Sequence, residues 1–200
     1  MIHPIGHNPF ATRSVRPGAL DYIFPTDLRV EDVVERLRAH GWWGEIVGPH
    51  GSGKSTLLET LRPKLEAAGR HVVAMTLYQG QRRLPPQGRH QGEWPTPAQL
   101  VVDGYEQLAM PARWALQRRC RRARAGLLVS THRPTGLPTL LHTAPDLDVL
   151  TAIVNQLTGG DFSVITPEDV ARAYLVRGHD VRETLFDLYS LYERRRRHDR

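Results

Sequence analysis

Residues 48–56 read Gly-Pro-His-Gly-Ser-Gly-Lys-Ser-Thr and match the pattern G-x-x-x-x-G-K-[ST] at every fixed position. The apolar pair Ile46-Val47 precedes this stretch, and a helix-forming run from Leu57 to Leu61 follows it. A glycine-rich turn between a buried strand and a helix lets successive backbone N–H groups point at one anion. The sequence therefore predicts a phosphate-binding loop (Walker A) and, with it, an α/β fold with a parallel sheet.

The residues of this loop have separate expected tasks. The backbone N–H groups and the Lys54 side chain are expected to hold the phosphates of a nucleoside triphosphate, and the Ser55 hydroxyl to bind Mg²⁺. His50 is expected to contribute only its backbone. The predicted binding residues are Gly48, Gly51, Ser52, Gly53, Lys54, Ser55 and Thr56. Because the guanine-reading pattern Asn/Thr-Lys-x-Asp is absent, the sequence favours ATP, together with Mg²⁺, as the ligand.

Length and composition indicate a soluble globular protein of one ordinary domain. The chain has 200 residues, of which 40% are hydrophobic and 24% charged. Its longest apolar runs fall short of the roughly 20 residues of a membrane-spanning helix, and residues 1–8 do not resemble a secretory signal. The single cysteine, Cys120, excludes an internal disulfide and a cysteine-built metal site. We expect a cytoplasmic protein without a membrane segment.

The net charge of +6 is concentrated in two segments. The segment Arg118–Arg124 contributes +5 and the tail Arg194–Arg200 contributes +4, which leaves −3 for the rest of the chain. The first segment is interpreted either as a solvated helix end that matches the helix dipole or as a contact to a nucleic-acid backbone. No aromatic residue lies within it, so base stacking is not indicated. The arginines Arg194–Arg197 of the tail are expected to form a frayed, solvated end; the alternative is a second binding site.

Periodicity and turn residues divide the chain into three parts. Residues 1–25, rich in Pro and Gly, predict an extended arm; residues 26–145 predict the nucleotide-binding core; residues 146–200 predict a helical lid with a basic tail.

Strands are expected at 42–47, 71–77, 100–102, 126–130 and 139–142, with the second one buried. Helices are expected from a cap at Asp27 to Gly41, across Pro63 to Gly69, and from Glu106 to about Arg124. A long loop is expected over 78–98, and lid helices over 146–157, 166–177 and 180–197. Strands that alternate with helices predict a parallel sheet.

Polar residues that end two of the predicted strands are candidates for the chemistry. Asp103 closes the apolar run 100–102, the Walker B pattern, and is expected to hold Mg²⁺ with Ser55. Glu106 is expected either to orient the attacking water or to be an exposed residue of a first helical turn. Ser130, Thr131 and His132 end the fourth strand, where one of them, with Thr131 as the candidate, is expected to contact the γ-phosphate; the alternative is ordinary turn chemistry.

The order of these motifs resembles the AAA+ class of P-loop ATPases. The segment Gly178–Leu185 is similar to the Gly-x-x-x-Arg-x-x-Leu stretch that opens the last lid helix in that class. The resemblance implies ATP hydrolysis and implies that Arg182 reaches the γ-phosphate from the lid. One departure is that only about seven residues separate Thr131 from the fifth strand, too few for the helix that carries an arginine finger. Arg133 is the nearest substitute.

Three functions follow from these patterns. The first is a Mg²⁺-dependent ATPase with Lys54, Glu106, Thr131 and Arg182 in catalytic roles. The second is a nucleotide-dependent switch with little turnover that binds a protein or nucleic-acid partner. The third is a small-molecule kinase, whose mobile lid would be the 78–98 loop with Arg82, Arg83 and Arg89. The signature Leu-Ser-Gly-Gly-Gln of ABC-type ATPases is absent.

Overall fold

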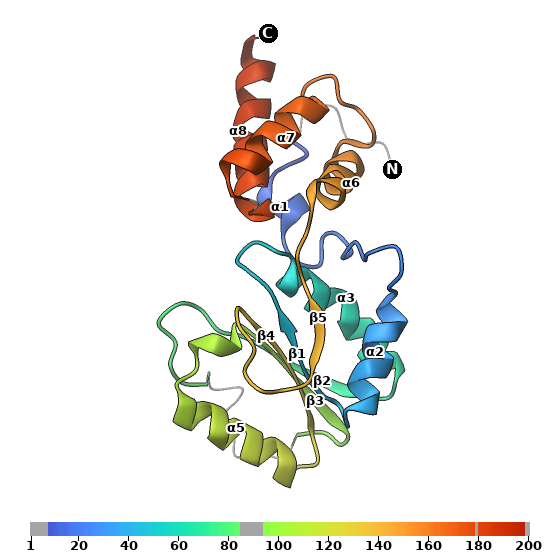
Figure 1. Cartoon of the computed structure of the whole chain (residues 1–200), viewed down its shortest axis with the longest axis vertical. Coiled ribbons are helices and arrows are strands. Elements are labelled where there is room, and N and C mark those ends of the chain that lie inside the picture. Colours follow the sequence, from blue (N-terminus) through green and yellow to red (C-terminus); the bar gives the residue numbers. More distant parts are fainter. Residues whose placement is uncertain (1–7, 85–93, 179, 199–200) are drawn as a thin grey trace.

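A five-stranded parallel sheet forms the centre of the molecule (Figure 1). The computed structural model describes residues 8–84, 94–178 and 180–198. The strands are β1 (Trp43–Val47), β2 (His71–Thr76), β3 (Ala98–Asp103), β4 (Gly126–Thr131) and β5 (Thr139–His142). Their order in the sheet is β2-β3-β4-β1-β5, and every neighbouring pair is parallel. The predicted α/β fold is confirmed, and the arrangement is consistent with that of P-loop NTPases.

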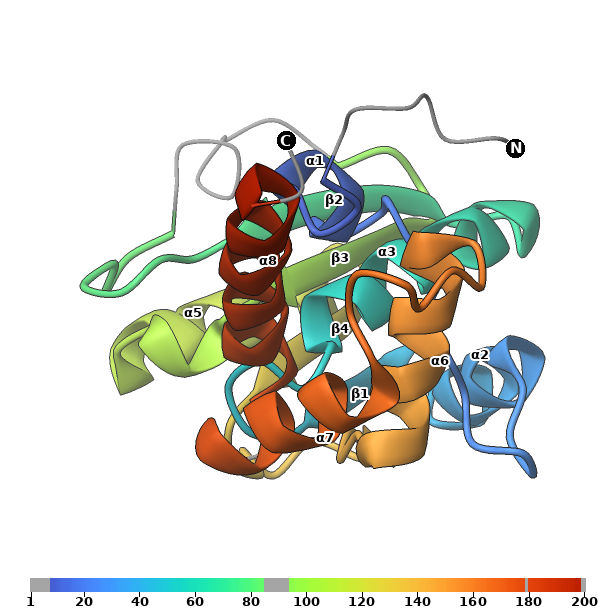
Figure 2. The ribbon, with the colours of Figure 1, turned by 90° about the horizontal axis from the view of Figure 1, so that it is seen from above.

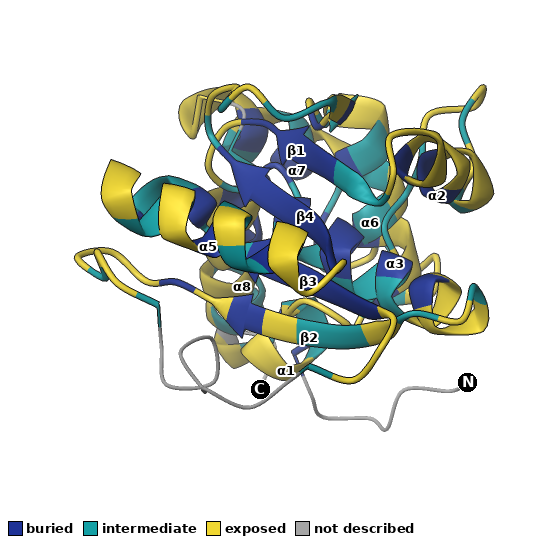
Figure 3. Ribbon diagram, turned by 90° about the horizontal axis from the view of Figure 1, so that it is seen from below, coloured by how far each residue is buried: buried dark blue, intermediate teal, exposed yellow. Residues whose placement is uncertain are grey.

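Helices cover both faces of the sheet because side chains alternate along each central strand. On β4, Leu127 and Val129 pack on the side of α5 (Met110–Arg122), whereas Leu128 packs on the opposite side. That opposite side is covered by α2 (Val30–Ala39) and α3 (Lys54–Ala67). Figure 3 shows the central strands β1, β3 and β4 as mostly buried. A core on both faces fixes the carboxyl ends of the strands relative to one another.

The sequence prediction was wrong for β2, which is a mostly exposed edge strand instead of a buried one. Its run His-Val-Val-Ala-Met-Thr is apolar enough for a central strand. The strand order nevertheless leaves it with one neighbour, β3, and with Met75 as its one buried side chain. Apolar content alone does not reveal how many neighbours a strand has.

Two helix starts also differ from the prediction. α2 begins at Val30, where the Asp32 carboxylate accepts a hydrogen bond from the Arg29 backbone N–H (2.7 Å), so Asp27 does not cap it. The helix expected from Glu106 is divided into a 3₁₀ turn, η1 (Tyr105–Gln107), and α5. Gly104, with φ of 78°, supplies the left-handed residue that turns the chain out of β3 into η1. Glu106 therefore lies on a short turn next to the sheet.

Three helices form a lid with an apolar core of its own (Figures 1 and 2). They are α6 (Leu147–Thr158), α7 (Pro167–Val176) and α8 (Val181–His198). Asp146 caps α6 by accepting from Val149 N (2.9 Å), and Thr166 and Asp169 form a capping box at α7. The N-terminal arm contributes Phe10, which is buried among the lid helices. The arm includes a one-turn helix, α1 (Thr12–Val15), that the sequence prediction lacked.

The basic tail is part of α8 as far as His198, so the prediction of a frayed end was wrong for this stretch. Arg195 binds both oxygens of Asp169, with 3.0 Å between Nη2 and Oδ1, and also the carbonyl of Val164. The guanidinium of Arg195 lowers the pKa of the buried Asp169 carboxyl. This ion pair ties α8 to α7 and gives the last helix a fixed place in the lid. No helix among the described residues is long and apolar enough to cross a membrane.

Candidate phosphate-binding site

The loop between β1 and α3 has the geometry that its glycines predict. A Cβ on Gly48 would lie 2.1 Å from Thr143 Oγ1 and 2.5 Å from the Thr143 carbonyl oxygen, so only glycine fits there. Gly51 and Gly53 have φ angles of 67° and 87°, a region that other residues rarely adopt. Ser52 braces the loop through hydrogen bonds to Pro49 O (2.9 Å) and Thr143 Oγ1 (2.6 Å). The loop is thus held in a fixed curve by the chain that follows β5.

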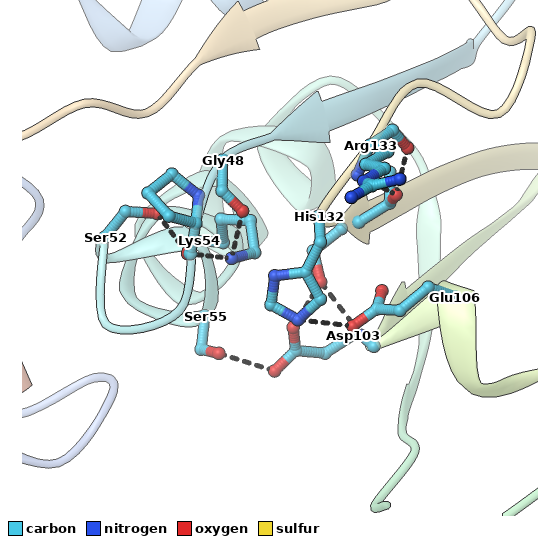
Figure 4. A network of polar contacts seen from close by, with 12 residues as sticks. Gly48, Ser52, Lys54, Ser55, Asp103, Glu106, His132 and Arg133 are labelled. Atoms are coloured by element: carbon cyan, nitrogen blue, oxygen red, sulfur yellow. Dashed lines mark hydrogen bonds and ion pairs between the residues drawn. The ribbon is translucent and has the colours of Figure 1, made fainter. Parts of the chain in front are cut away.

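Lys54 is the first residue of α3, and its side chain is turned back over the loop (Figure 4). Its Nζ donates to the carbonyl oxygens of Gly48 (2.8 Å) and Pro49 (2.5 Å). Burial lowers the pKa of Lys54, while the carboxylates of Glu106 and Asp103 act in the opposite direction. The ammonium group has lost part of its hydration and is well placed to receive an anion.

Ser55 and Asp103 meet across the site, as the sequence predicts. Ser55 Oγ donates to Asp103 Oδ2 at 2.6 Å, and Ser130 Oγ donates to the other carboxylate oxygen. Gly104 N in turn donates to Ser130 Oγ (2.9 Å). β4 lies between β1 and β3, which is why Ser130 reaches Asp103. A network of hydrogen bonds therefore fixes the position of both predicted metal ligands.

This oxygen pair fits Mg²⁺, which proteins bind through one or two side-chain oxygens while phosphates and water fill the other positions. Among the described residues, no group of three or more His, Cys, Asp or Glu side chains could hold a metal ion by itself. Ser55 and Asp103 would be the residues that hold Mg²⁺.

Glu106 is paired with a histidine from the end of β4. His132 Nε2 lies 2.8 Å from Glu106 Oε1 (Figure 4). The His50 ring packs on the His132 ring with 3.7 Å between centroids. Burial lowers the pKa of His132, although the Glu106 carboxylate opposes that shift. Glu106 Oε2 is buried and has no hydrogen-bond partner among the described residues. The side chain of His50 is therefore part of the site, whereas only its backbone was expected there. The Oε2 atom of Glu106 remains available to accept a hydrogen bond.

Thr131 lies away from the cavity, unlike its two neighbours. It is fully buried, its Oγ1 donates to the Arg133 carbonyl, and Arg133 N donates back to Oγ1 (3.1 Å). Ser130 and His132 line the cavity, whereas Thr131 does not. The structure therefore brings two of the three candidate strand-end residues to the site and engages the third in a turn.

A cavity of about 980 Å³ extends from the phosphate loop to the arm and the lid. The arm lines it with residues such as Val15 and Ile23, and the lid with residues such as Ile153 and Leu185. Tyr22 of the arm lies against Gly53, since a Cβ there would come within 3.2 Å of the Tyr22 ring. A polar floor and apolar walls form a site with room for a phosphorylated ligand that also has a flat apolar group.

The start of α8 brings two charges of opposite sign close to the phosphate loop. Arg182, the predicted lid arginine, lines the cavity and is close enough to Lys54 to lower the pKa of that side chain. Asp180 was not predicted as a site residue, but a Cβ on Gly51 would lie only 1.9 Å from Asp180 Oδ1. The same oxygen accepts from Glu183 N (3.0 Å), so Asp180 caps α8. The cap signal was present in the sequence, but not its contact with the phosphate loop.

Several other candidates lie outside the cavity. The connection 132–138 between β4 and β5 contains no helix, and Thr135 anchors it to the buried Glu45 carboxylate (2.8 Å from Thr135 N). Of the predicted kinase lid, Arg82 and Arg83 do not line the cavity, and Arg89 lies outside the described residues. Burial raises the pKa of the Cys120 thiol to about 12, which leaves no nucleophilic thiolate.

Comparisons with known proteins leave the family open. No protein-family model matches the chain, and no curated protein matches it. Among solved structures, PCH-2 from C. elegans aligns over 88% of this chain and 70% of its own, with 11% identity and a TM-score of 0.44. A similarity at this level of identity and TM-score carries no function over to this chain.

Proposed function

We propose that this protein binds Mg²⁺ and ATP at the phosphate loop and hydrolyses the nucleotide. The contact of 2.6 Å between Ser55 Oγ and Asp103 Oδ2 carries this proposal, because it joins the end of the phosphate loop to the end of a second strand. Those two oxygens come from positions 48 residues apart. Their meeting beside a lysine and a curved glycine loop favours phosphate chemistry over a chance glycine-rich turn.

Each residue would have a defined task in this reaction. The loop N–H groups bind the phosphates, and Lys54 exchanges the carbonyls of Gly48 and Pro49 for phosphate oxygens. Ser55 and Asp103 would hold Mg²⁺, which would supply positive charge to offset the charge on those oxygens. Glu106 orients the attacking water with the carboxylate oxygen that has no other partner. Arg182 contacts the outermost phosphate from the lid.

A nucleotide-dependent switch with little turnover is the second candidate. The observation that favours it is the pair between His132 Nε2 and Glu106 Oε1 at 2.8 Å. A carboxylate held by a histidine has one oxygen fewer for water, and the connection 132–138 has no helix to present an arginine to a neighbouring copy. The protein would then bind ATP and change its surface without rapid hydrolysis.

The deciding experiment measures phosphate release from Mg-ATP by the purified protein. Lys54→Ala is expected to abolish both nucleotide binding and turnover. Lys64→Ala is the matched control, because Lys64 is the only other lysine of the chain and forms an exposed ion pair with Glu31. Turnover by Lys54→Ala equal to that of the parent would contradict the proposal.

Glu106→Gln separates hydrolysis from the switch. If the protein is an ATPase, the variant should bind Mg-ATP and release phosphate at least tenfold more slowly, because a general base of this kind contributes about 10²–10⁴ to the rate. Equal, near-zero turnover by the parent and the variant, with ATP binding intact in both, would favour the switch. Phosphate that moves to an added acceptor instead of water would favour the kinase.

A further inference from the structure

One side of the molecule is strongly basic, and the ATPase proposal does not use it. Between Gln107 and Pro145 the chain contains seven arginines and no acidic residue. Six of these arginines lie between Arg113 and Arg124, on α5 or directly after it. The loop that follows β2 approaches the start of α5, where Ala109 N donates to Arg82 O (3.3 Å), and adds Arg82 and Arg83. Figures 2 and 3 both show this loop beside α5.

Two arginines of this region are held against tryptophan rings. Arg119 lies 4.2 Å from the centroid of a ring of Trp94, and Arg121 lies 5.2 Å from that of Trp43. Arg119 lies on the side of α5 that faces the sheet, together with the buried Leu116 and Cys120, whereas Arg121 is exposed. The guanidinium groups still contribute positive charge to the surface.

The opposite side of α5 carries a stripe of a different kind. Trp114, Arg118 and Arg122 follow one another at intervals of four residues, so they lie on one face of the helix, about 6 Å apart along its axis. All three are exposed, and Trp114 has 65% of its surface open to solvent. Within the described part of the chain, no acidic side chain forms an ion pair with Arg118 or Arg122. We call these three residues the α5 stripe.

We propose that the α5 stripe binds single-stranded nucleic acid. An exposed tryptophan gives an unpaired base a ring to stack on, and two arginines one and two turns further along can contact successive phosphates. Aromatic residues are absent from Arg118–Arg124 itself, but Trp114 supplies one a single turn before it. The sequence segment alone did not indicate stacking because the relevant ring lies outside the cluster.

The chemistry of the stripe favours this partner over two others. A second copy of this chain that met this surface with the same surface would bring arginines against arginines, because there is no acidic residue from Gln107 to Pro145. An acidic peptide would satisfy the charges, but it has no need of an exposed indole ring one turn before them. Duplex DNA keeps its bases stacked inside. Its phosphates could contact the arginines, but it would offer no unpaired base to stack on Trp114.

The test measures the anisotropy of a fluorescein-labelled 20-nucleotide single strand, as DNA and as RNA, over a series of salt concentrations. Trp114→Ala is expected to weaken binding about tenfold, since one stacked base is worth roughly this amount. The double variant Arg118→Gln/Arg122→Gln is expected to weaken it as well. It should also reduce the slope of log K against log salt by about 1.4, because each phosphate that an arginine neutralises contributes about 0.7.

Three controls keep the experiment decisive. Arg194→Gln/Arg197→Gln removes the same charge from the tail of α8 and should leave binding within about twofold of the parent. Lys54→Ala should bind the strand as the parent does, so the result does not depend on the ATPase proposal. Thermal unfolding checks that each surface variant is folded.

Binding that Trp114→Ala leaves unchanged would overturn the proposal, even if the arginine variants weaken it. So would equal weakening by the α5 and tail variants, tighter binding of the matched duplex, or displacement of the strand by equimolar polyglutamate. No binding at 50 mM salt would also overturn it, because electrostatic attachment is strongest at low salt.

Discussion

His132 is the residue whose role depends most on the geometry of the site. It donates from Nε2 to Glu106 Oε1 at 2.8 Å, and its lowered pKa favours the neutral ring, which keeps this donor without placing a full charge beside Lys54. In the ATPase we propose, His132 is a positioning residue that fixes one oxygen of Glu106 so that the other faces the water. The bond is therefore expected to affect the chemical step more than nucleotide binding.

The corresponding prediction is a split between kcat and KM. His132→Ala should lower kcat about tenfold while KM stays within about twofold, because only the orientation of the general base is lost. His132→Gln should recover part of kcat, since its amide N–H can donate to Glu106. His50→Ala removes the packed ring but keeps the Glu106 bond, and its smaller effect serves as the control. Steady-state phosphate release decides; an unchanged kcat in His132→Ala would remove the positioning role.

Whether a residue of the site could be predicted depends on how far away in the sequence its partners lie. Lys54, Ser55 and Asp103 could be predicted because a glycine-rich motif and the end of an apolar strand each specify a place within a few residues. The pairing of Glu106 with His132 could not, because it depends on β4 lying between β1 and β3. The role of Thr131 could not be predicted either. Ser130, Thr131 and His132 are all polar residues at a strand end, and only the hydrogen bond from Thr131 Oγ1 to the Arg133 carbonyl shows that Thr131 belongs to a turn.

At the scale of elements, the start of α8 determines which charges would meet the phosphates of the proposed nucleotide. Asp180 caps the helix and places a carboxylate oxygen against Gly51, while Arg182, two residues on, lines the cavity beside that loop. A negative charge beside the phosphate loop opposes the arrival of a triphosphate. The cap therefore stabilises the lid helix at a cost in affinity for the nucleotide.

Asp180→Asn tests this balance without removing the cap, because asparagine caps helices about as well as aspartate. The variant is expected to bind Mg-ATP more tightly, by several-fold and up to about tenfold, which corresponds to about 1.4 kcal/mol. Titration calorimetry measures the change. Asp161→Asn, which removes an exposed lid carboxylate that does not line the cavity, should leave affinity unchanged. Weaker binding by Asp180→Asn would mean that the Asp180 carboxylate stabilises the complex with Mg-ATP instead of opposing it.

The predictions for whole elements failed where the environment of an element depends on residues far away in the sequence. β2 has the composition of a central strand and lies at the edge, because its place is set by the order of strands. The tail looked like a solvated run of arginines, yet Arg195 reaches Asp169 on another helix. The lid helices themselves were predictable, since Asp146 and the Thr166–Asp169 box mark their starts locally.

For the molecule as a whole, the main feature is that three segments far apart in sequence share one cavity. Tyr22 of the arm, Lys54 of the core and Arg182 of the lid all line it. The arm also connects the other two parts, since Phe10 is buried in the lid while Tyr22 N donates to Thr60 Oγ1 of α3 (2.9 Å). A ligand in this cavity would therefore contact arm, core and lid together.

Mg-ATP should accordingly stabilise the whole chain in a single transition. A ligand at about 100 times its Kd adds about 2.7 kcal/mol to the free energy of unfolding, which in a chain of this size corresponds to a rise in Tm of roughly 5–10 °C. Differential scanning calorimetry with and without Mg-ATP measures the shift. Lys54→Ala should show none, and a chelator that removes Mg²⁺ should reduce it, because Ser55 and Asp103 then lose the ion that links them to the phosphates. Two separate transitions, of which only one moves, would mean that the nucleotide is held by the core alone and that arm and lid merely lie beside it.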